Sequence, residues 1–174
     1  INKIANYTFI GGNDLIKKTI IKKNSQFYLK VFRKLYLSQK IKQNLIFPGA
    51  ISLLKFLKSK NIKIYICTNK PKYLTSKIIN NTHLKRYVDK YFCSDEYKVK
   101  KPNRKFFLKI LKKIKINKNQ IIYVGDSIVD YKFCKNSLIK FFLFRNKRIK
   151  YPNKINLRLL KLNRILFDYK NIRR

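Results

Sequence analysis

The chain has 174 residues, of which 45% are hydrophobic and 14% aromatic, and its formal net charge at pH 7 is +37. That hydrophobic fraction is typical of a globular domain, so the charge alone does not indicate disorder. The length suits one domain, or a core with a small appended module, and excludes two large domains. No apolar run reaches the roughly 20 residues that span a bilayer, and nothing at the amino end resembles a signal peptide.

The basic residues are scattered along the chain and form no block. A nucleic-acid footprint is normally a concentrated patch or stripe of Lys and Arg. The abundant residue types, such as Lys, Ile and Asn, share AT-rich codons, so drift in base composition explains the bias. We therefore expect no specific nucleic-acid partner. A nucleic-acid binder stays open as an alternative if the basic residues gather on one face of the folded protein.

The three cysteines, Cys67, Cys93 and Cys134, are odd in number and widely spaced. This spacing matches neither a disulfide framework nor a set of zinc ligands. It indicates reduced, mostly buried thiols in a cytoplasmic protein. Because no apolar run is long enough to span a bilayer, we expect no membrane partner. The single histidine, His83, lies in a polar segment and is expected at the surface.

Helical periodicity dominates the first third of the chain. Three helices are predicted there: residues 14–23, 26–41 and 51–61. Pro48 breaks the pattern before the third helix. The composition changes near Phe47, so we divide the chain into a small helical unit, residues 1–46, and a core, residues 47–174.

Short apolar runs alternate with helical segments in the rest of the chain. The predicted strands are residues 62–67, 91–94, 121–124 and 139–144. The predicted helices are residues 73–80, 106–114, a segment ending near 136, and 157–166. This alternation indicates an α/β fold with a parallel sheet covered on both faces. Ligands bind such sheets beyond the carboxyl ends of the strands, where the polar pairs Thr68-Asn69 and Gly125-Asp126 fall.

Two of the seven carboxylates lie close together at a strand end. Asp126 and Asp130 are four residues apart where an apolar strand turns into a helix, so both can face one point above the sheet edge. Such oxygen ligands suit magnesium, which typically uses one or two carboxylates with water and substrate phosphate. The alternative is that Asp126 caps the helix and Asp130 is a solvated acid of its first turn.

Two other polar positions suit a phosphate group. Thr68 offers a hydroxyl at the end of its strand, and Asn69 offers a backbone N–H beside it, although a threonine there can also simply begin a loop. Lys101, fixed before Pro102, can supply positive charge to a phosphoryl group. By composition alone, the neighbouring Lys100 would serve equally well.

The order and spacing of these segments resemble three motifs of the haloacid dehalogenase (HAD) superfamily of hydrolases. These are a strand ending in Thr68, a Lys-Pro pair at 101–102 before a helix, and Gly-Asp-Ser-x-x-Asp at 125–130. The resemblance narrows to the phosphoglycolate phosphatase group and runs through about Phe144. The matching segments are Phe9-Ile10-Gly11-Gly12, Phe47-Pro48-Gly49, Thr68-Asn69-Lys70-Pro71, Lys100-Lys101-Pro102 and Val124 to Asp130.

This resemblance implies a Rossmann-like parallel sheet core with a small α-helical cap, and a magnesium-dependent phosphatase. The implied substrate is a small phosphorylated metabolite, 2-phosphoglycolate above all. Thr68 and Lys101 would bind the phosphoryl group, with Asn69 beside them. Asp126 would ligate Mg²⁺, and Asp130 would orient the metal's ligand sphere. Charge neutralisation at the transferring phosphoryl group would supply most of the catalysis.

The sequence also departs from the superfamily pattern. The first motif, Asp-x-Asp-Gly-Thr, carries the nucleophile and the general acid and base, and it would precede residue 1. We therefore expect the first, central strand to be missing and this fragment alone to be inactive, because Asp14 lies in the presumed cap. Gly11, Gly12 and Asn13 are expected cap contacts. A non-catalytic HAD-like binding module is the alternative, and the oligomeric state stays open.

Overall fold

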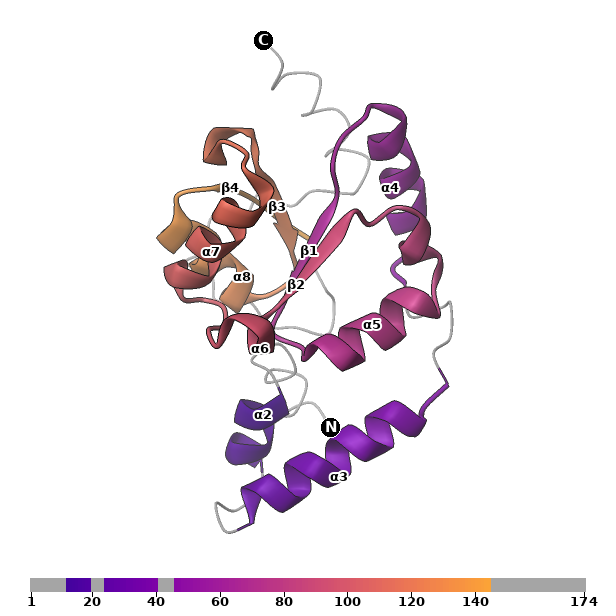
Figure 1. Cartoon of the computed structure of the whole chain (residues 1–174), viewed down its shortest axis with the longest axis vertical. Coiled ribbons are helices and arrows are strands. Elements are labelled where there is room, and N and C mark those ends of the chain that lie inside the picture. Colours follow the sequence, from indigo (N-terminus) through magenta and orange to yellow (C-terminus); the bar gives the residue numbers. More distant parts are fainter. Residues whose placement is uncertain (1–11, 20–23, 41–45, 145–174) are drawn as a thin grey trace.

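The computed structural model describes residues 12–19, 24–40 and 46–144 (Figure 1). The strands are β1 (Tyr65–Thr68), β2 (Lys90–Cys93), β3 (Ile122–Gly125) and β4 (Lys140–Leu143). The helices are α2 (Gly12–Thr19), α3 (Ser25–Ser38), α4 (Ala50–Ser59), α5 (Lys72–Asn80), α6 (Ser94–Tyr97), α7 (Arg104–Ile114) and α8 (Ile128–Ser137), with 3-10 turns η2 (His83–Arg86) and η3 (Lys118–Gln120). The predicted helix over 157–166 lies outside the described residues.

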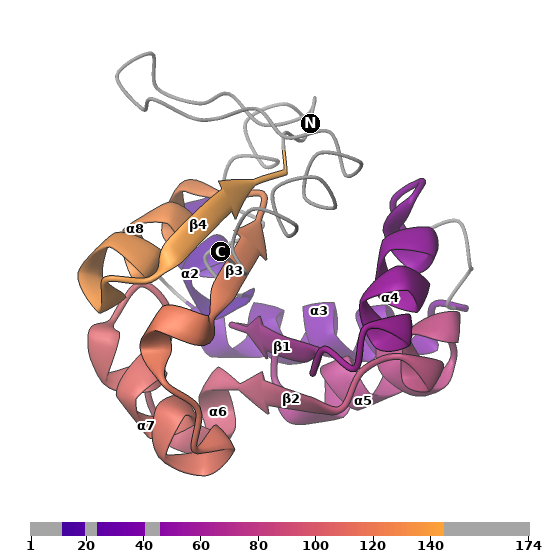
Figure 2. The same ribbon diagram turned by 90° about the horizontal axis from the view of Figure 1, so that it is seen from above.

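The strands form parallel pairs, as the alternation of strands and helices predicts. Cys67 is paired with Phe92 in the β1–β2 pair, and Val124 with Phe142 in the β3–β4 pair. Among the residues that the structure describes, these pairs make two two-stranded sheets and not one continuous sheet, as Figure 2 shows. Within that part of the chain, β1 and β3 therefore each pair along one edge. A further strand between them stays a prediction.

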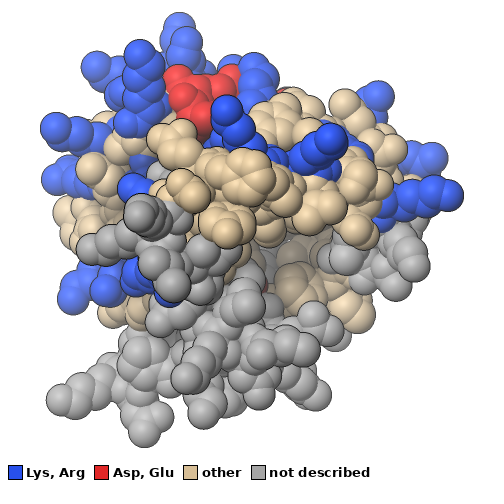
Figure 3. Space-filling model, turned by 90° about the horizontal axis from the view of Figure 1, so that it is seen from below, with Lys and Arg blue, Asp and Glu red and all other residues tan. Residues whose placement is uncertain are grey.

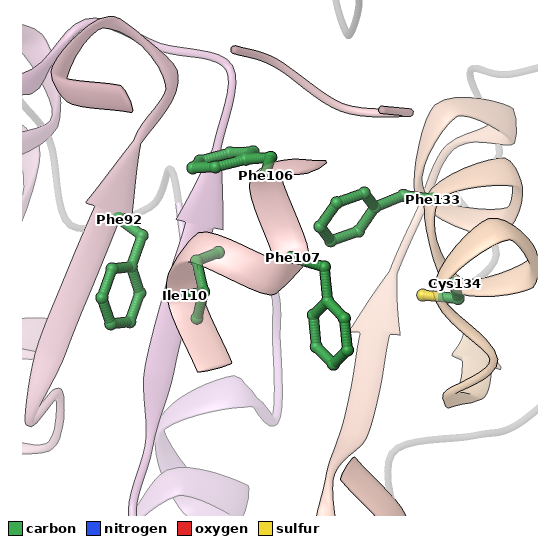
Figure 4. Close-up of a cluster of buried hydrophobic side chains, with 6 residues drawn as sticks. All are labelled: Phe92, Phe106, Phe107, Ile110, Phe133 and Cys134. Atoms are coloured by element: carbon green, nitrogen blue, oxygen red, sulfur yellow. The ribbon is translucent and has the colours of Figure 1, made fainter. Parts of the chain in front are cut away.

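An aromatic core joins the two strand pairs. Helix α7 is amphipathic and buries Phe106, Phe107 and Ile110. These side chains pack with Phe92 of β2 and with Phe133 and Cys134 of α8 (Figure 4). Partly buried residues of β1, β3 and β4 pack around the same cluster. Burying each large apolar side chain contributes about 1.5–3 kcal/mol, so this core holds the strand ends of the two pairs in place.

The structure corrects two of the predicted boundaries. Strand β1 begins at Tyr65 and not at Ile62. The Ile62 N–H donates to the Leu57 carbonyl of α4, and the Ile64 N–H bonds to a side chain, that of Asp89. The Ile64 N–H donates to Asp89 Oδ2 over 2.8 Å, and the Ile64 carbonyl accepts from the Asp89 N–H over 2.9 Å. Ser94, predicted as the end of a strand, instead begins the short helix α6.

Helices α2 and α3 pack against each other and meet the rest of the protein through lysines. Lys100 forms an ion pair with Asp14 of α2. Lys77 of α5 donates to the Gln39 carbonyl, just after the carboxyl end of α3, over 3.2 Å. Its position suits the negative end of the helix dipole. The boundary between a cap, residues 1–46, and a core, residues 47–174, stays a prediction.

The protein surface carries its positive charge in separate places on the face shown in Figure 3. There, Lys and Arg side chains lie mainly along the margins, with an acidic group among them at the top of the view, and other residues cover the middle. This view is in keeping with the scattered basic residues of the sequence and concerns one face alone. In the described residues, no helix has both the length and the apolar character needed to cross a membrane.

Candidate active site

The site lies where β3 turns into α8. Strand β3 ends at Gly125 and α8 begins at Ile128. Ser127 is the N-cap residue, and its hydroxyl accepts from the Asp130 N–H over 3.1 Å and donates to Asp130 Oδ2 over 2.6 Å. The capping residue is therefore Ser127 and not Asp126, the candidate considered from the sequence. This cap turns the Asp130 carboxylate back toward the strand end, where 6% of the residue is exposed.

Gly125 makes room for that carboxylate. A Cβ atom at position 125 would lie 2.6 Å from the Asp130 Cβ and 2.8 Å from its Oδ2. Both distances are far below van der Waals contact, so a larger residue would push Asp130 away. The glycine of the Gly-Asp-Ser segment is thus required by the close approach of a side chain to the strand.

Lys101 brings the two strand pairs together at their carboxyl ends. Its Nζ atom donates to Asp130 Oδ1 over 2.7 Å, to the Tyr123 hydroxyl over 2.8 Å and to the Cys67 carbonyl over 2.9 Å. An ammonium group has three N–H donors, so all three are used. Lys101 is 9% exposed, and a buried cation needs such partners to offset the loss of water.

These contacts set the protonation of the site. Burial acts to raise the pKa of the Asp130 carboxyl, but the Lys101 ammonium and the hydrogen bonds from Ser127 and Tyr123 hold that pKa below its ordinary value. Burial and the Asp130 charge raise the pKa of Tyr123 well above the ordinary value. Burial also raises the pKa of Cys67 to about 12. Near neutral pH the site therefore holds a carboxylate, a phenol and a thiol.

Asn69 positions the backbone of Lys101. Its Oδ1 accepts from the Lys101 N–H over 2.8 Å, and its Nδ2 donates to the Lys101 carbonyl over 3.1 Å. The Thr68 hydroxyl accepts from the Lys70 N–H over 3.1 Å, which closes the turn after β1. The sequence suggested the backbone N–H of Asn69 as a phosphate contact and did not predict this role of its side chain.

The structure thus brings Asn69, Lys101 and Asp130 into one network, with Thr68 next to Cys67 at its edge. Asp126 lies partly buried in the turn between β3 and α8. Sequence reasoning missed Tyr123 and Ser127. A tyrosine in a buried strand needs a partner for its hydroxyl, and Ser-x-x-Asp at a helix start is a capping signal, so both left a trace in the sequence.

Of the three expected cap contacts, the structure describes the surroundings of Gly12. Gly12 begins α2, and a Cβ there would meet Phe32 of α3 at 3.4 Å. Gly12 therefore faces α3. Gly11 and the side chain of Asn13 lie outside the described residues, and so does the Phe9-Ile10 part of that motif. Their contact with a substrate stays a prediction.

The residues present fit an open magnesium site better than a closed metal cage. In the described part of the chain, no three His, Cys, Asp or Glu side chains are grouped as metal ligands. Magnesium usually takes one or two carboxylates and completes its shell with water and phosphate oxygens. Asp126 can supply such a carboxylate. Both oxygens of Asp130 already accept hydrogen bonds, which suits an orienting role.

The fold is a Rossmann-like α/β domain with a charged polar network beyond the carboxyl ends of its strands. A family model described as haloacid dehalogenase-like hydrolase matches residues 2–144. The chain belongs to this family, as its motifs indicate. It is 32% identical to a phosphoglycolate phosphatase of Aquifex aeolicus over 124 residues, which are 70% of this chain and 58% of the relative.

Solved structures show the same fold. A predicted phosphoglycolate phosphatase from Haemophilus somnus superposes with a TM-score of 0.81 at 16% identity, over 97% of this chain and 81% of that chain. CbbY from Rhodobacter sphaeroides, in complex with phosphate, superposes with a TM-score of 0.66 at 12% identity, over 92% of this chain and 85% of that chain. The chain spans 58% of the length of the Aquifex relative.

Proposed function

We propose that this chain forms the phosphate-binding part of a magnesium-dependent phosphoric monoester hydrolase for a small phosphorylated metabolite, with 2-phosphoglycolate as the first candidate. The observation that supports this most is the Lys101 ammonium, which is bonded to Asp130 at the carboxyl ends of the strands, while Asn69 fixes the Lys101 backbone. A parallel α/β domain binds ligands at that edge of its sheet, and a fixed cation there can bind a phosphate. The Aquifex relative supports the choice of substrate.

In this proposal Lys101 and the Thr68 hydroxyl bind oxygens of the phosphoryl group. All three N–H donors of Lys101 are bonded to the protein in the structure, so phosphate must replace one acceptor. The neutral Cys67 carbonyl and Tyr123 hydroxyl are easier to replace than the Asp130 carboxylate, because breaking a buried ion pair costs more. Lys101 would therefore keep Asp130 and exchange a neutral partner for a phosphate oxygen.

Asp126 would hold the magnesium ion, and Asp130 would orient that arrangement through its fixed carboxylate. When bound, magnesium would neutralise charge on the phosphoryl oxygens. The protein's own contribution would be to hold the phosphate in line for attack and to keep Lys101 charged beside it. The network of Ser127, Tyr123 and Asn69 serves this by fixing both charged side chains.

The reaction also needs a nucleophilic carboxylate. The sequence has no Asp-x-Asp-Gly-Thr segment, and most of its carboxylates already pair with lysine. Those in ion pairs with lysine are Asp14, Asp89, Glu96 and Asp130. We therefore propose that residues 1–174 bind phosphate without turnover, and that activity requires a segment carrying that motif.

The saturated Lys101 also favours a second candidate function, a non-catalytic phosphate-binding module. One experiment separates the two. The corresponding amino-terminal segment of the Aquifex phosphatase is fused before residue 1, and magnesium-dependent phosphate release from 2-phosphoglycolate is measured. Turnover by the fusion, and none by residues 1–174, supports the phosphatase. A folded fusion that binds phosphate without turnover supports the binding module.

Two variants of the fusion test the site itself. Lys101→Met should lower turnover by about 100-fold or more, the scale reported for removing one transition-state donor. Lys105→Met, an exposed lysine on the first turn of α7, is the matched control and should stay within about twofold because its side chain lies outside the site. Loss of less than about tenfold in Lys101→Met would contradict the proposed site.

A further inference from the structure

Tyr123 connects the two charged side chains of the site to each other. Its ring is fixed in the core by Phe133, with centroids 5.8 Å apart, and by Phe141 at 6.3 Å. The hydroxyl at the end of this ring reaches Lys101 Nζ at 2.8 Å and Asp130 Oδ1 at 2.9 Å. It also lies 3.3 Å from the Cys67 carbonyl on β1. A phenylalanine would fill the same space and lose all three contacts.

The Tyr123 hydroxyl has one hydrogen to donate, and this decides which hydrogen bonds it donates and which it accepts. Lys101 has no acceptor atom, so toward Lys101 the Tyr123 oxygen accepts. Its own hydrogen then goes to the Asp130 carboxylate, which is the nearer and the charged acceptor. Asp130 Oδ1 consequently receives two donors, one cationic and one neutral. The neutral donor, the Tyr123 O–H, is held by the core and keeps its position when the Lys101 side chain moves.

We propose that Tyr123 is a positioning residue that keeps Asp130 in place and releases Lys101 to the phosphoryl group. This rests on the proposed function, in which Lys101 exchanges a neutral acceptor for a phosphate oxygen. When Lys101 turns toward phosphate, the Tyr123 O–H still holds Asp130 Oδ1, so the carboxylate neither rotates nor loses its second donor. Without the hydroxyl, Lys101 stays closer to Asp130 and binds phosphate less well.

The test uses residues 1–174 with inorganic phosphate and Mg²⁺ as the probe. Tyr123→Phe should weaken phosphate binding about tenfold in calorimetry, the change expected for one lost hydrogen bond to charged groups. Tyr65→Phe is the matched control, since Tyr65 is also a strand tyrosine packed against a core phenylalanine. In a Lys101→Met background, Tyr123→Phe should have no further effect, because the lysine that it positions is gone.

If Tyr123 only stabilised the fold, Tyr123→Phe would lower the melting temperature, and its phosphate affinity would equal that of Tyr65→Phe. That outcome overturns the inference. Additive effects of Tyr123→Phe and Lys101→Met overturn it as well. If Lys101→Met itself leaves phosphate affinity unchanged, the proposed function is what fails.

A second measurement needs no phosphate. Labelling by an amine-reactive reagent, read by mass spectrometry, should report a changed reactivity of Lys101 relative to Lys105 in Tyr123→Phe and not in Tyr65→Phe. An unchanged ratio in both variants counts against the inference.

Discussion

The Asp130 carboxylate lies against the backbone of Gly125, so closely that a Cβ at position 125 would be 2.7 Å from the Asp130 Cγ. This contact joins the end of β3 to the first turn of α8. Because Asp130 is also bonded to Lys101 and Ser127, a shift of its side chain disturbs several partners at once. The small size of residue 125 is therefore a condition for the whole network.

We predict that Gly125→Ala lowers the free energy of unfolding by about 1–3 kcal/mol, the usual cost of overpacking a filled site. Urea denaturation measures this change. Gly12→Ala is the control, since a Cβ there meets Phe32 at 3.4 Å, an ordinary contact, and alanine favours a helix. Equal stability of Gly125→Ala and the parent would mean that Asp130 does not occupy the position described.

Asp89 should make the stability depend on acid pH. Its carboxylate accepts from Lys58 Nζ over 2.7 Å and from the Ile64 N–H over 2.8 Å. Burial acts to raise the pKa of Asp89, but these two donors, with Lys63, lower it below the ordinary 3.8. Because the pKa is lower in the folded state, the ionised carboxylate stabilises the fold at any pH above the pKa that this carboxyl has in the unfolded chain. That stabilisation is lost as the pH falls through the folded value.

The expected result is that Asp89→Asn is less stable than the parent at pH 7 by about 1–3 kcal/mol, the range for hydrogen bonds to a charged group. The difference should shrink as the pH falls below about 4, where the unfolded carboxyl takes up its proton. Urea denaturation of both proteins at a series of pH values between 7 and 2.5 gives this difference. A difference that stays constant over the series would contradict the assignment.

Leu138 is a site where the structure predicts a gain of stability. It is the C-cap residue that follows α8, it has the left-handed conformation with φ 55° and ψ 46°, and it is 67% exposed. This conformation costs a residue with a Cβ about 1–2 kcal/mol. Leu138→Gly should therefore raise the free energy of unfolding by about 0.5–1 kcal/mol, since the greater freedom of unfolded glycine offsets part of the gain.

Leu138→Ala separates backbone strain from loss of the exposed leucine. Alanine keeps the Cβ and with it the strain, so this variant should melt close to the parent while Leu138→Gly melts higher. If both variants change the melting temperature equally, the left-handed backbone is not the cause.

The sequence by itself determined the α/β class and most of the elements. Apolar periodicity and turn residues are local properties, so the helix at 106–114 and the strand at 121–124 were predicted within about two residues of α7 and β3. Motif order also indicated the family, because Thr68, Lys101 and Asp130 must each follow or precede a particular element. Periodicity did not separate Ile62 to Ile64 from β1, since Asp89, the partner of Ile64, is distant in the chain.

Tertiary structure decided which polar side chains act together. The bond between Lys101 and Asp130 joins residues 29 apart, and the one between Lys101 and the Cys67 carbonyl joins residues 34 apart. In a chain so rich in lysine, composition cannot distinguish Lys101 from Lys100. Packing does, because it buries the Lys101 ammonium among three acceptors while Lys100 pairs with Asp14 at the surface. A buried cation needs acceptors on every side, and only the folded chain brings them together.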